Sequence, residues 1–144
     1  MKAGLPLEYY YSPHHVWLQI DENIATIGFT PYVSSKLGEI IYIDFPEEDQ
    51  NIHQNAIAFS VESVQDLFDF VSPISGVIFE INSALFDEPG LLNDDPLGEG
   101  WVIRVEMEKE SDLLNLIRAG EYTNLISKIM QKPKVDETQA LGSI

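Results

Sequence analysis

Hydrophobic and polar residues alternate in short runs along the first part of the chain, and Gly, Pro, Asn and Asp separate the runs. This two-residue period predicts β-strands, because successive side chains of a strand point to opposite faces of a sheet. Apolar runs at residues 16–20 and 24–29 flank the polar residues 21–23, which predicts a β-hairpin.

The same alternation continues beyond this hairpin. It predicts five further strands, at residues 39–45, 56–63, 67–72, 76–82 and 101–107. In three of these strands it assigns apolar residues to one face: Ile41, Ile43 and Phe45; Ile57, Phe59 and Val61; Val77, Phe79 and Ile81. Residues 64–66 fall between two of the strands, so we expect Val64, Gln65 and Asp66 at the tip of a hairpin. The pattern as a whole predicts a mostly β sandwich or barrel.

Helices are a minority in this pattern. Thr30 and Pro31 predict the start of a short helix that ends near Gly38, since Thr caps helices and Pro suits the first helical turn. The segment 82–100 is rich in Asp, Pro and Gly, which predicts a loop with one helical turn at residues 83–85.

Two helices are predicted near the C-terminal end. Ser111 can cap the first, whose apolar residues lie between 113 and 117, and Gly120 is a candidate for its end. The second keeps helical spacing from Tyr122 to Met130.

Length and charge narrow the possible functions. A chain of 144 residues is typical of one domain, and we expect an N-terminal lead at 1–8, a domain at 9–130 and a flexible tail at 131–144. The net charge of −16 repels nucleic-acid phosphates and anionic lipids, so neither nucleic acid nor a membrane is an expected partner. Neither a signal peptide nor a long apolar run is found, so a cytoplasmic protein is expected.

Catalytic and metal-binding motifs are missing from the sequence. No cysteine is present, and His14, His15 and His53 lack the spacing that directs imidazoles at one metal ion. No nucleophile elbow, phosphate-binding loop or dinucleotide fingerprint occurs. The sequence therefore predicts a protein that is not an enzyme and has neither catalytic residues nor a metal site.

Six separated segments resemble those of one known family, in the same order and at the same spacing. They are YSPHHVWL at 11–18, ATIGFT at 25–30, LGEI at 37–40, VESV at 61–64, SPISG at 72–76, and PGLLNDDP at 89–96 with the Gly-Trp pair at 100–101. Together they resemble the glycine cleavage system H protein, and the resemblance spans roughly residues 9–129.

The resemblance implies a barrel-sandwich hybrid of the lipoyl and biotinyl type, with short helices and a C-terminal helical segment. Members of the family carry aminomethyl groups on a lipoyl arm between the P, T and L proteins of glycine cleavage. Their arm is attached to a lysine that follows a Glu-Ser-Val run at a hairpin tip. Here Gln65 stands at that position, and its carboxamide nitrogen is a very poor nucleophile. No lipoate is therefore expected at the usual site.

Other departures from the family pattern fall around the expected arm. Val16 follows His15 where the family usually has Glu, Asp66 replaces a small residue, and Tyr32 replaces a histidine. The hairpin-tip and cleft residues that the resemblance implies are Glu62, Ser63, Val64, Asp66, His15 and Tyr32.

These observations favour an H-like protein without the lipoyl lysine, acting as a binding or scaffold module. Its expected partners are proteins, such as glycine cleavage components or lipoyl-transfer enzymes. One alternative is an acyl carrier that is modified at a non-standard lysine, and a more remote alternative is a small enzyme on the same barrel.

Overall fold

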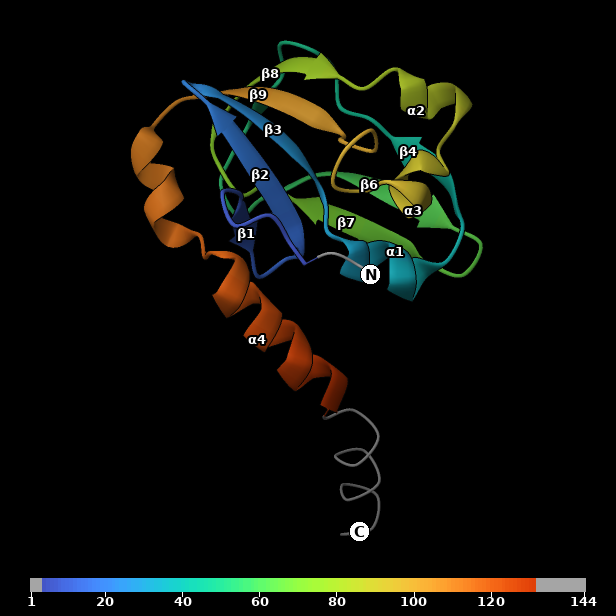
Figure 1. Ribbon diagram of the computed structural model, residues 1–144. Helices are drawn as coiled ribbons and strands as arrows, with labels where there is room; N and C mark the ends of the chain where they lie inside the picture. Colours follow the sequence, from blue (N-terminus) through green and yellow to red (C-terminus); the bar gives the residue numbers. More distant parts are fainter. Residues whose placement is uncertain (1–3, 132–144) are drawn as a thin grey trace, which may run out of the picture.

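The computed structural model describes residues 4–131 and contains two antiparallel β-sheets (Figure 1). The larger sheet has the strand order β1-β2-β3-β9-β8-β5 and the smaller has the order β4-β6-β7. The strands are β1 (Tyr10–Ser12), β2 (Val16–Asp21), β3 (Ile24–Phe29), β4 (Ile40–Asp44), β5 (Asn51–Ile52), β6 (Ile57–Ser63), β7 (Leu67–Val71), β8 (Gly76–Ile81) and β9 (Ile103–Met107). The predicted mostly β fold is confirmed.

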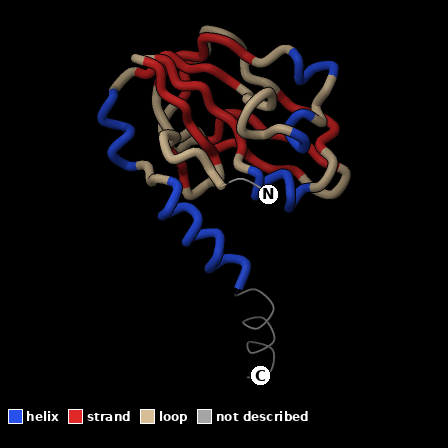
Figure 2. The backbone as a smooth tube through the Cα atoms, in the orientation of Figure 1, coloured by secondary structure: helices blue, strands red, loops and turns tan. Residues whose placement is uncertain are grey.

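Helices lie at the periphery of the strands (Figure 2). They are α1 (Pro31–Leu37), α2 (Ala84–Asp87), α3 (Leu91–Asp94), the 3-10 helix η1 (Glu110–Asn115) and α4 (Ala119–Gln131). Helices α1, α2 and α3 gather at the end of the molecule that holds β4, whereas α4 packs on β1 and projects away from the sheets (Figure 1).

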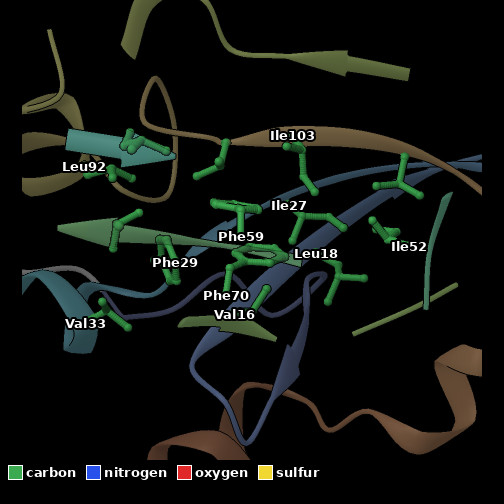
Figure 3. Close-up of a cluster of buried hydrophobic side chains, with 14 of the residues drawn as sticks. Val16, Leu18, Ile27, Phe29, Val33, Ile52, Phe59, Phe70, Leu92 and Ile103 are labelled. Carbon is green, nitrogen blue, oxygen red and sulfur yellow. The ribbon is translucent and has the colours of Figure 1, made fainter. Parts of the chain in front are cut away.

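The main core lies between the two sheets, where alternate side chains of facing strands meet (Figure 3). Phe59 of β6 and Phe70 of β7 stack with ring centroids 4.4 Å apart, and Phe29 of β3 meets Phe70 edge-on at 5.3 Å. Each fully buried side chain of this size contributes about 1.5–3 kcal/mol relative to an exposed one. These contacts hold the β6–β7 hairpin against the larger sheet.

A second, smaller core covers the opposite face of β2. It contains Tyr9, Tyr11, Trp17, Ala119 and Tyr122, and it attaches α4 to the sheet. Trp17 points away from the main core because its neighbours in β2, Val16 and Leu18, point into it. The Trp17 ring lies on Gly28 of β3, where a Cβ atom would come within 2.8 Å of the ring. Only glycine fits there without displacing the indole.

Irregular pairing changes which apolar residues face the core, and three predicted faces are partly wrong. In β4 a bulge between Ile40 and Tyr42 buries Ile40 and leaves Ile41 49% exposed, although Ile43 is buried as predicted. In β8 a bulge between Ile78 and Glu80 buries Ile78 and exposes Phe79. A register shift at the start of β6 exposes Ile57.

The helical predictions also need correction. Segment 82–100 contains two short helices, α2 and α3, where a single turn was predicted. The helix predicted from Ser111 is the 3-10 helix η1, which ends at Asn115 because Ile117 forms two backbone hydrogen bonds with Tyr11. Gly120 lies inside α4, so it does not end the preceding helix.

Helix α4 extends past the predicted C-terminal end of the domain at residue 130. Helix α4 includes Gln131, the first residue of the predicted tail, and residues 132–144 lie outside the described part of the chain. Within residues 4–131, no helix is long and apolar enough to cross a membrane.

Candidate functional site

A tight turn joins β6 to β7 and contains Val64, Gln65 and Asp66. The strands pair in antiparallel register, with Glu62 opposite Leu67 at the last paired position. The hairpin predicted from the alternation is therefore present, and all three turn residues are exposed to solvent.

The hydroxyl of Ser63 fixes the backbone of this turn. Ser63 Oγ accepts hydrogen bonds from the backbone N–H groups of Gln65, at 3.1 Å, and Asp66, at 3.0 Å. The Ser63 N–H in turn donates to the Asp66 carbonyl at 2.8 Å. Because Ser63 is buried, these bonds are shielded from water and define one backbone conformation.

Two segments far away in the sequence brace the turn. The Val64 N–H donates to the Glu39 carbonyl at 3.1 Å, which ties the turn to the segment after α1. The Asn93 side chain of α3 holds that segment from the other side: its Nδ2 donates to the Gly38 carbonyl at 2.7 Å, and its Oδ1 accepts from the Ile40 N–H at 3.1 Å. The turn therefore rests on a hydrogen-bonded support.

The Gln65 side chain lies next to this support, at Gly38. Gly38 has a φ of 76°, a left-handed conformation that favours glycine, and a Cβ atom on it would lie 3.7 Å from Gln65 Nε2. The Gln65 group that lies there is a carboxamide, which donates and accepts hydrogen bonds but is not a nucleophile. No lysine lies in the turn: the lysines among residues 4–131 are Lys36 in α1, Lys109 before η1 and Lys128 in α4.

His15 and Tyr32 belong to a second group of side chains, centred on Tyr122 of α4. Tyr122 Oη lies 2.8 Å from His15 Nδ1 and 2.6 Å from Thr30 Oγ1. The rings of His15 and Tyr32 pack with their centroids 4.5 Å apart. Burial, followed by the charge of His14, lowers the pKa of His15 to about 4, so this imidazole is neutral at pH 7. Burial also raises the pKa of Tyr122 to about 12, which keeps its hydroxyl protonated.

A cavity of about 420 Å³ separates the turn at residues 13–15 from β7. His14 and His15 line one side, and Leu67, Phe68 and Asp69 line the other. The structure therefore brings His15 close to the first residues of β7, just after the hairpin turn. Tyr32 lines a different cavity, with Tyr122 and other residues of α4.

His53 lies apart from the other histidines, in a cavity beside β8 and β9. Among residues 4–131, no group of three or more His, Cys, Asp or Glu side chains is arranged to hold a metal ion.

Sequence reasoning did not identify three residues that shape these sites. Thr30 was predicted as a helix cap, but its hydroxyl binds Tyr122 and caps no N–H of α1. Tyr122 was predicted only as a position with helical spacing, and Asn93 entered only as part of the segment PGLLNDDP that carries the family resemblance. The pairing of each with a residue 50 or more positions away leaves no local signal.

The His15 environment predicts a loss of stability in acid. The pKa of His15 is about 4 in the folded chain and 6.5 in an unfolded one, so the unfolded chain binds a proton first as the pH falls. This group has no effect above pH 6.5, and its destabilisation grows as the pH falls toward about 4. We expect urea unfolding to show a larger loss of stability between pH 7 and pH 4.5 in the wild type than in His15→Asn.

Asn suits this variant because His15 has a φ of 70°, which Asn tolerates well. The matched control is His53→Asn, which removes an exposed histidine that lies apart from His15, so the acid-dependent loss of stability assigned to His15 should remain in this variant. Equal pH dependence in the wild type and His15→Asn would contradict the assignment of the effect to His15.

Comparison with known sequences places these features in one family. The sequence profile of the family "Glycine cleavage H-protein" matches residues 8–129. The glycine cleavage system H protein of Staphylococcus epidermidis is 36% identical over 125 residues, which cover 87% of this chain and 99% of that protein. Glycine cleavage system H protein 4 of Aquifex aeolicus is 32% identical over 130 residues, covering 90% of this chain and 76% of that protein.

The fold agrees with this comparison. The crystal structure of a glycine cleavage system H protein from Mycobacterium marinum superposes with a TM-score of 0.78 at 27% identity. The superposition covers 85% of this chain and 99% of the other. The two-sheet architecture and the C-terminal helix are thus shared with an experimentally determined structure.

Proposed function

This chain belongs to the glycine cleavage H-protein family, and we propose that it is a non-lipoylated member that acts as a protein-binding module. H proteins carry a group between the enzymes of glycine cleavage and are not enzymes themselves. The chain is accordingly not an enzyme, and the alternative of a small enzyme on the same barrel is set aside.

Gln65 is the observation that carries the proposal. The resemblance assigns the lipoyl-bearing lysine to the position after Glu62, Ser63 and Val64, and this position lies in the exposed turn between β6 and β7. Amide formation with lipoate requires a free amine, whereas the nitrogen of Gln65 is already part of an amide. The residues of the turn thus do not fit a covalently bound lipoate.

The structure around the turn supports a retained binding role. Ser63 fixes the turn, Glu39 anchors it, and Asn93 braces the segment beneath it. These hydrogen bonds hold the exposed turn in one backbone conformation, which lowers the entropic cost of binding a partner there. We therefore infer that the turn is kept in shape for recognition by a protein.

Charge indicates the kind of partner. With 24 acidic and 8 basic residues, the surface favours partners that carry basic patches, and the association should weaken as salt is added. Glycine cleavage components and lipoyl-transfer enzymes are the proposed partners, because proteins of this family meet them in their ordinary role.

The first test is the mass of the intact chain. We expect the protein isolated from its own host to have the mass of the unmodified sequence, because the proposed acceptor position holds no amine. Peptide mapping across residues 56–71 and around each lysine checks the result. A lipoyl-sized increment on any residue would overturn the proposal.

The proposed role as a protein-binding module is tested by direct binding measurements. The purified chain is titrated with the P, T and L proteins and the lipoate ligase of the same host, with a lysine-bearing H protein as the positive control. Binding of at least one component that weakens with salt supports a module. No binding, with the control binding normally, would rule out a role in this pathway.

A second candidate function is a carrier modified at Lys36. Lys36 is exposed in the last turn of α1, two residues before Gly38, which faces the side chain of Gln65. An arm on Lys36 would thus start close to the hairpin turn, whereas Lys109 lies beside Asp112 and Lys128 lies on α4. The mapping experiment separates the two candidates, and an increment that disappears in Lys36→Arg would establish this one.

A further inference from the structure

A groove of about 520 Å³ lies between β4 and α2. Both elements belong to the end of the molecule where the short helices gather (Figure 1). Residues 41–48 of β4 and the following turn form one wall. Ile81, Leu85, Phe86 and Pro89 form the other, at the end of β8 and around α2. Neither the turn at residues 64–66 nor the His15 cavity contributes to it.

Apolar side chains are exposed along this groove. Ile41 is 49% exposed, Tyr42 57% and Phe86 60%, and the Phe86 ring packs edge-on against Phe45 at 5.0 Å. The bulge in β4 explains the exposure of Ile41, because it turns this side chain away from the core. Contiguous exposed apolar surface of this kind marks interaction sites in proteins.

One edge of β4 is open. Within residues 4–131, β4 pairs with β6 alone. In β6, the hydrogen bond from the Ser63 N–H to the Asp66 carbonyl points toward β7. Alternate residues of a strand direct their backbone groups to opposite sides, so Glu62 and Ser60 direct theirs to β4. Their partners in β4 are Tyr42 and Asp44, which leaves the N–H and C=O of Ile43 directed at the open edge.

The edge is closed only at its beginning. Asn93 Oδ1 accepts the hydrogen bond of the Ile40 N–H, so no additional strand can pair there. From Ile43 onward the edge borders the groove. An open edge of this type is a template for one more strand.

The charged side chains that line the groove are all acidic. Asp44, Glu47 and Glu48 line it and are exposed, and Asp87 and Glu88 lie at the end of α2. No lysine or arginine is among the lining residues. A bound segment that carries Lys or Arg would be complementary to this rim.

We propose that this groove binds an extended segment of a partner protein, in which apolar side chains alternate with Lys or Arg, by adding a strand to β4. The apolar side chains contact Ile41, Tyr42 and Phe86. The basic ones face Glu47 and Glu48 in the turn after β4, and the backbone pairs with Ile43. The inference rests on the proposed function of a binding module and specifies its surface and the chemistry of its partner.

The test uses a hexapeptide of alternating Lys and Val, blocked at both ends, and a copy with alternate amides N-methylated. We expect the first to bind and to shift the Ile43 amide resonance, and the second not to bind, because N-methylation removes strand pairing. Glu47→Lys combined with Glu48→Lys should weaken binding about tenfold through loss of two exposed charge pairs. The control, Asp21→Lys with Glu22→Lys, changes the same charge at the distant β2–β3 turn.

Three outcomes would overturn the inference: equal binding of the N-methylated peptide, equal weakening by the control variant, or no binding to the unmodified wild type. The protein used is first shown by its mass to be unmodified. Failure of the peptide to bind that protein overturns only the proposed strand addition in the groove, whereas a lipoyl-sized mass increment overturns the proposed function.

Discussion

Gln65→Lys is expected to convert an unmodified chain into one that accepts lipoate. The turn is exposed, its backbone is fixed by the Ser63 hydroxyl, and Glu62, Ser63 and Val64 stand before the new amine as in the family pattern. A rigid, accessible turn presents an amine to an activated acyl group in one pose, which is what the ligase step requires. Incubation with lipoate ligase, lipoate and ATP should shift most of the chains from the unmodified to the lipoylated mass.

The matched control for this experiment is Gln65→Arg. Arginine supplies the same positive charge and a similar length but no amine that can be acylated, so it should remain unmodified. If Gln65→Lys also stays unmodified while a lysine-bearing H protein reacts in the same mixture, the ligase rejects this hairpin for a reason besides the missing amine. Asp66, which stands where the family has a small residue, is then the first residue to replace.

Gly76→Ala is expected to destabilise the fold strongly, although it adds only one methyl group. Gly76 pairs with Ile52 on one side and with Met107 on the other, and a Cβ atom there would overlap the Glu106 carbonyl oxygen. It would also approach Val105 Cγ1 within 2.7 Å. Relief requires the β8–β9 pairing to move, which costs about 3 kcal/mol and lowers Tm by roughly 10 °C.

Gly120→Ala is the matched control, because it adds the same methyl group in open space. Apart from its chain neighbours and the nearby backbone of α4, no described atom lies within 4 Å of a Cβ on Gly120, and the residue is exposed. Alanine has a higher helix propensity than glycine, so the free energy of unfolding of this variant should rise by up to about 1 kcal/mol. Thermal unfolding followed by circular dichroism compares the two. A Gly76→Ala variant as stable as the wild type would contradict the close packing of β8 on β9.

Local patterns account for the parts of the fold that were predicted correctly. The hairpin of β2 and β3 and the start of α1 at Pro31 each depend on neighbours in the sequence, so alternation and the preference of proline for the first helical turn identify them. The turn that contains Gln65 was placed in the same way. Its support by Asn93 was not predicted, because Asn93 and Gly38 are 55 residues apart in the sequence.

Long-range pairing accounts for the predictions that failed. A bulge adds a residue to one strand without a mark in its own sequence, so the faces of Ile41 and Phe79 were assigned on the assumption of regular pairing. Leu113 and Leu116 have helical spacing, but the segment after them pairs with Tyr11 and leaves the helix. Tertiary contacts outweighed local preference at each of these positions.

Because the two cores are separate, tryptophan fluorescence reports on only one of them. The chain has two tryptophans: Trp17 is buried in the smaller cluster with Tyr122, and Trp101 packs against the same cluster. Intrinsic fluorescence therefore reports on the attachment of α4 and is nearly blind to the space between the sheets. Circular dichroism instead follows the strands, so an emission change that precedes the loss of ellipticity would identify the release of α4 as a separate, earlier step of unfolding.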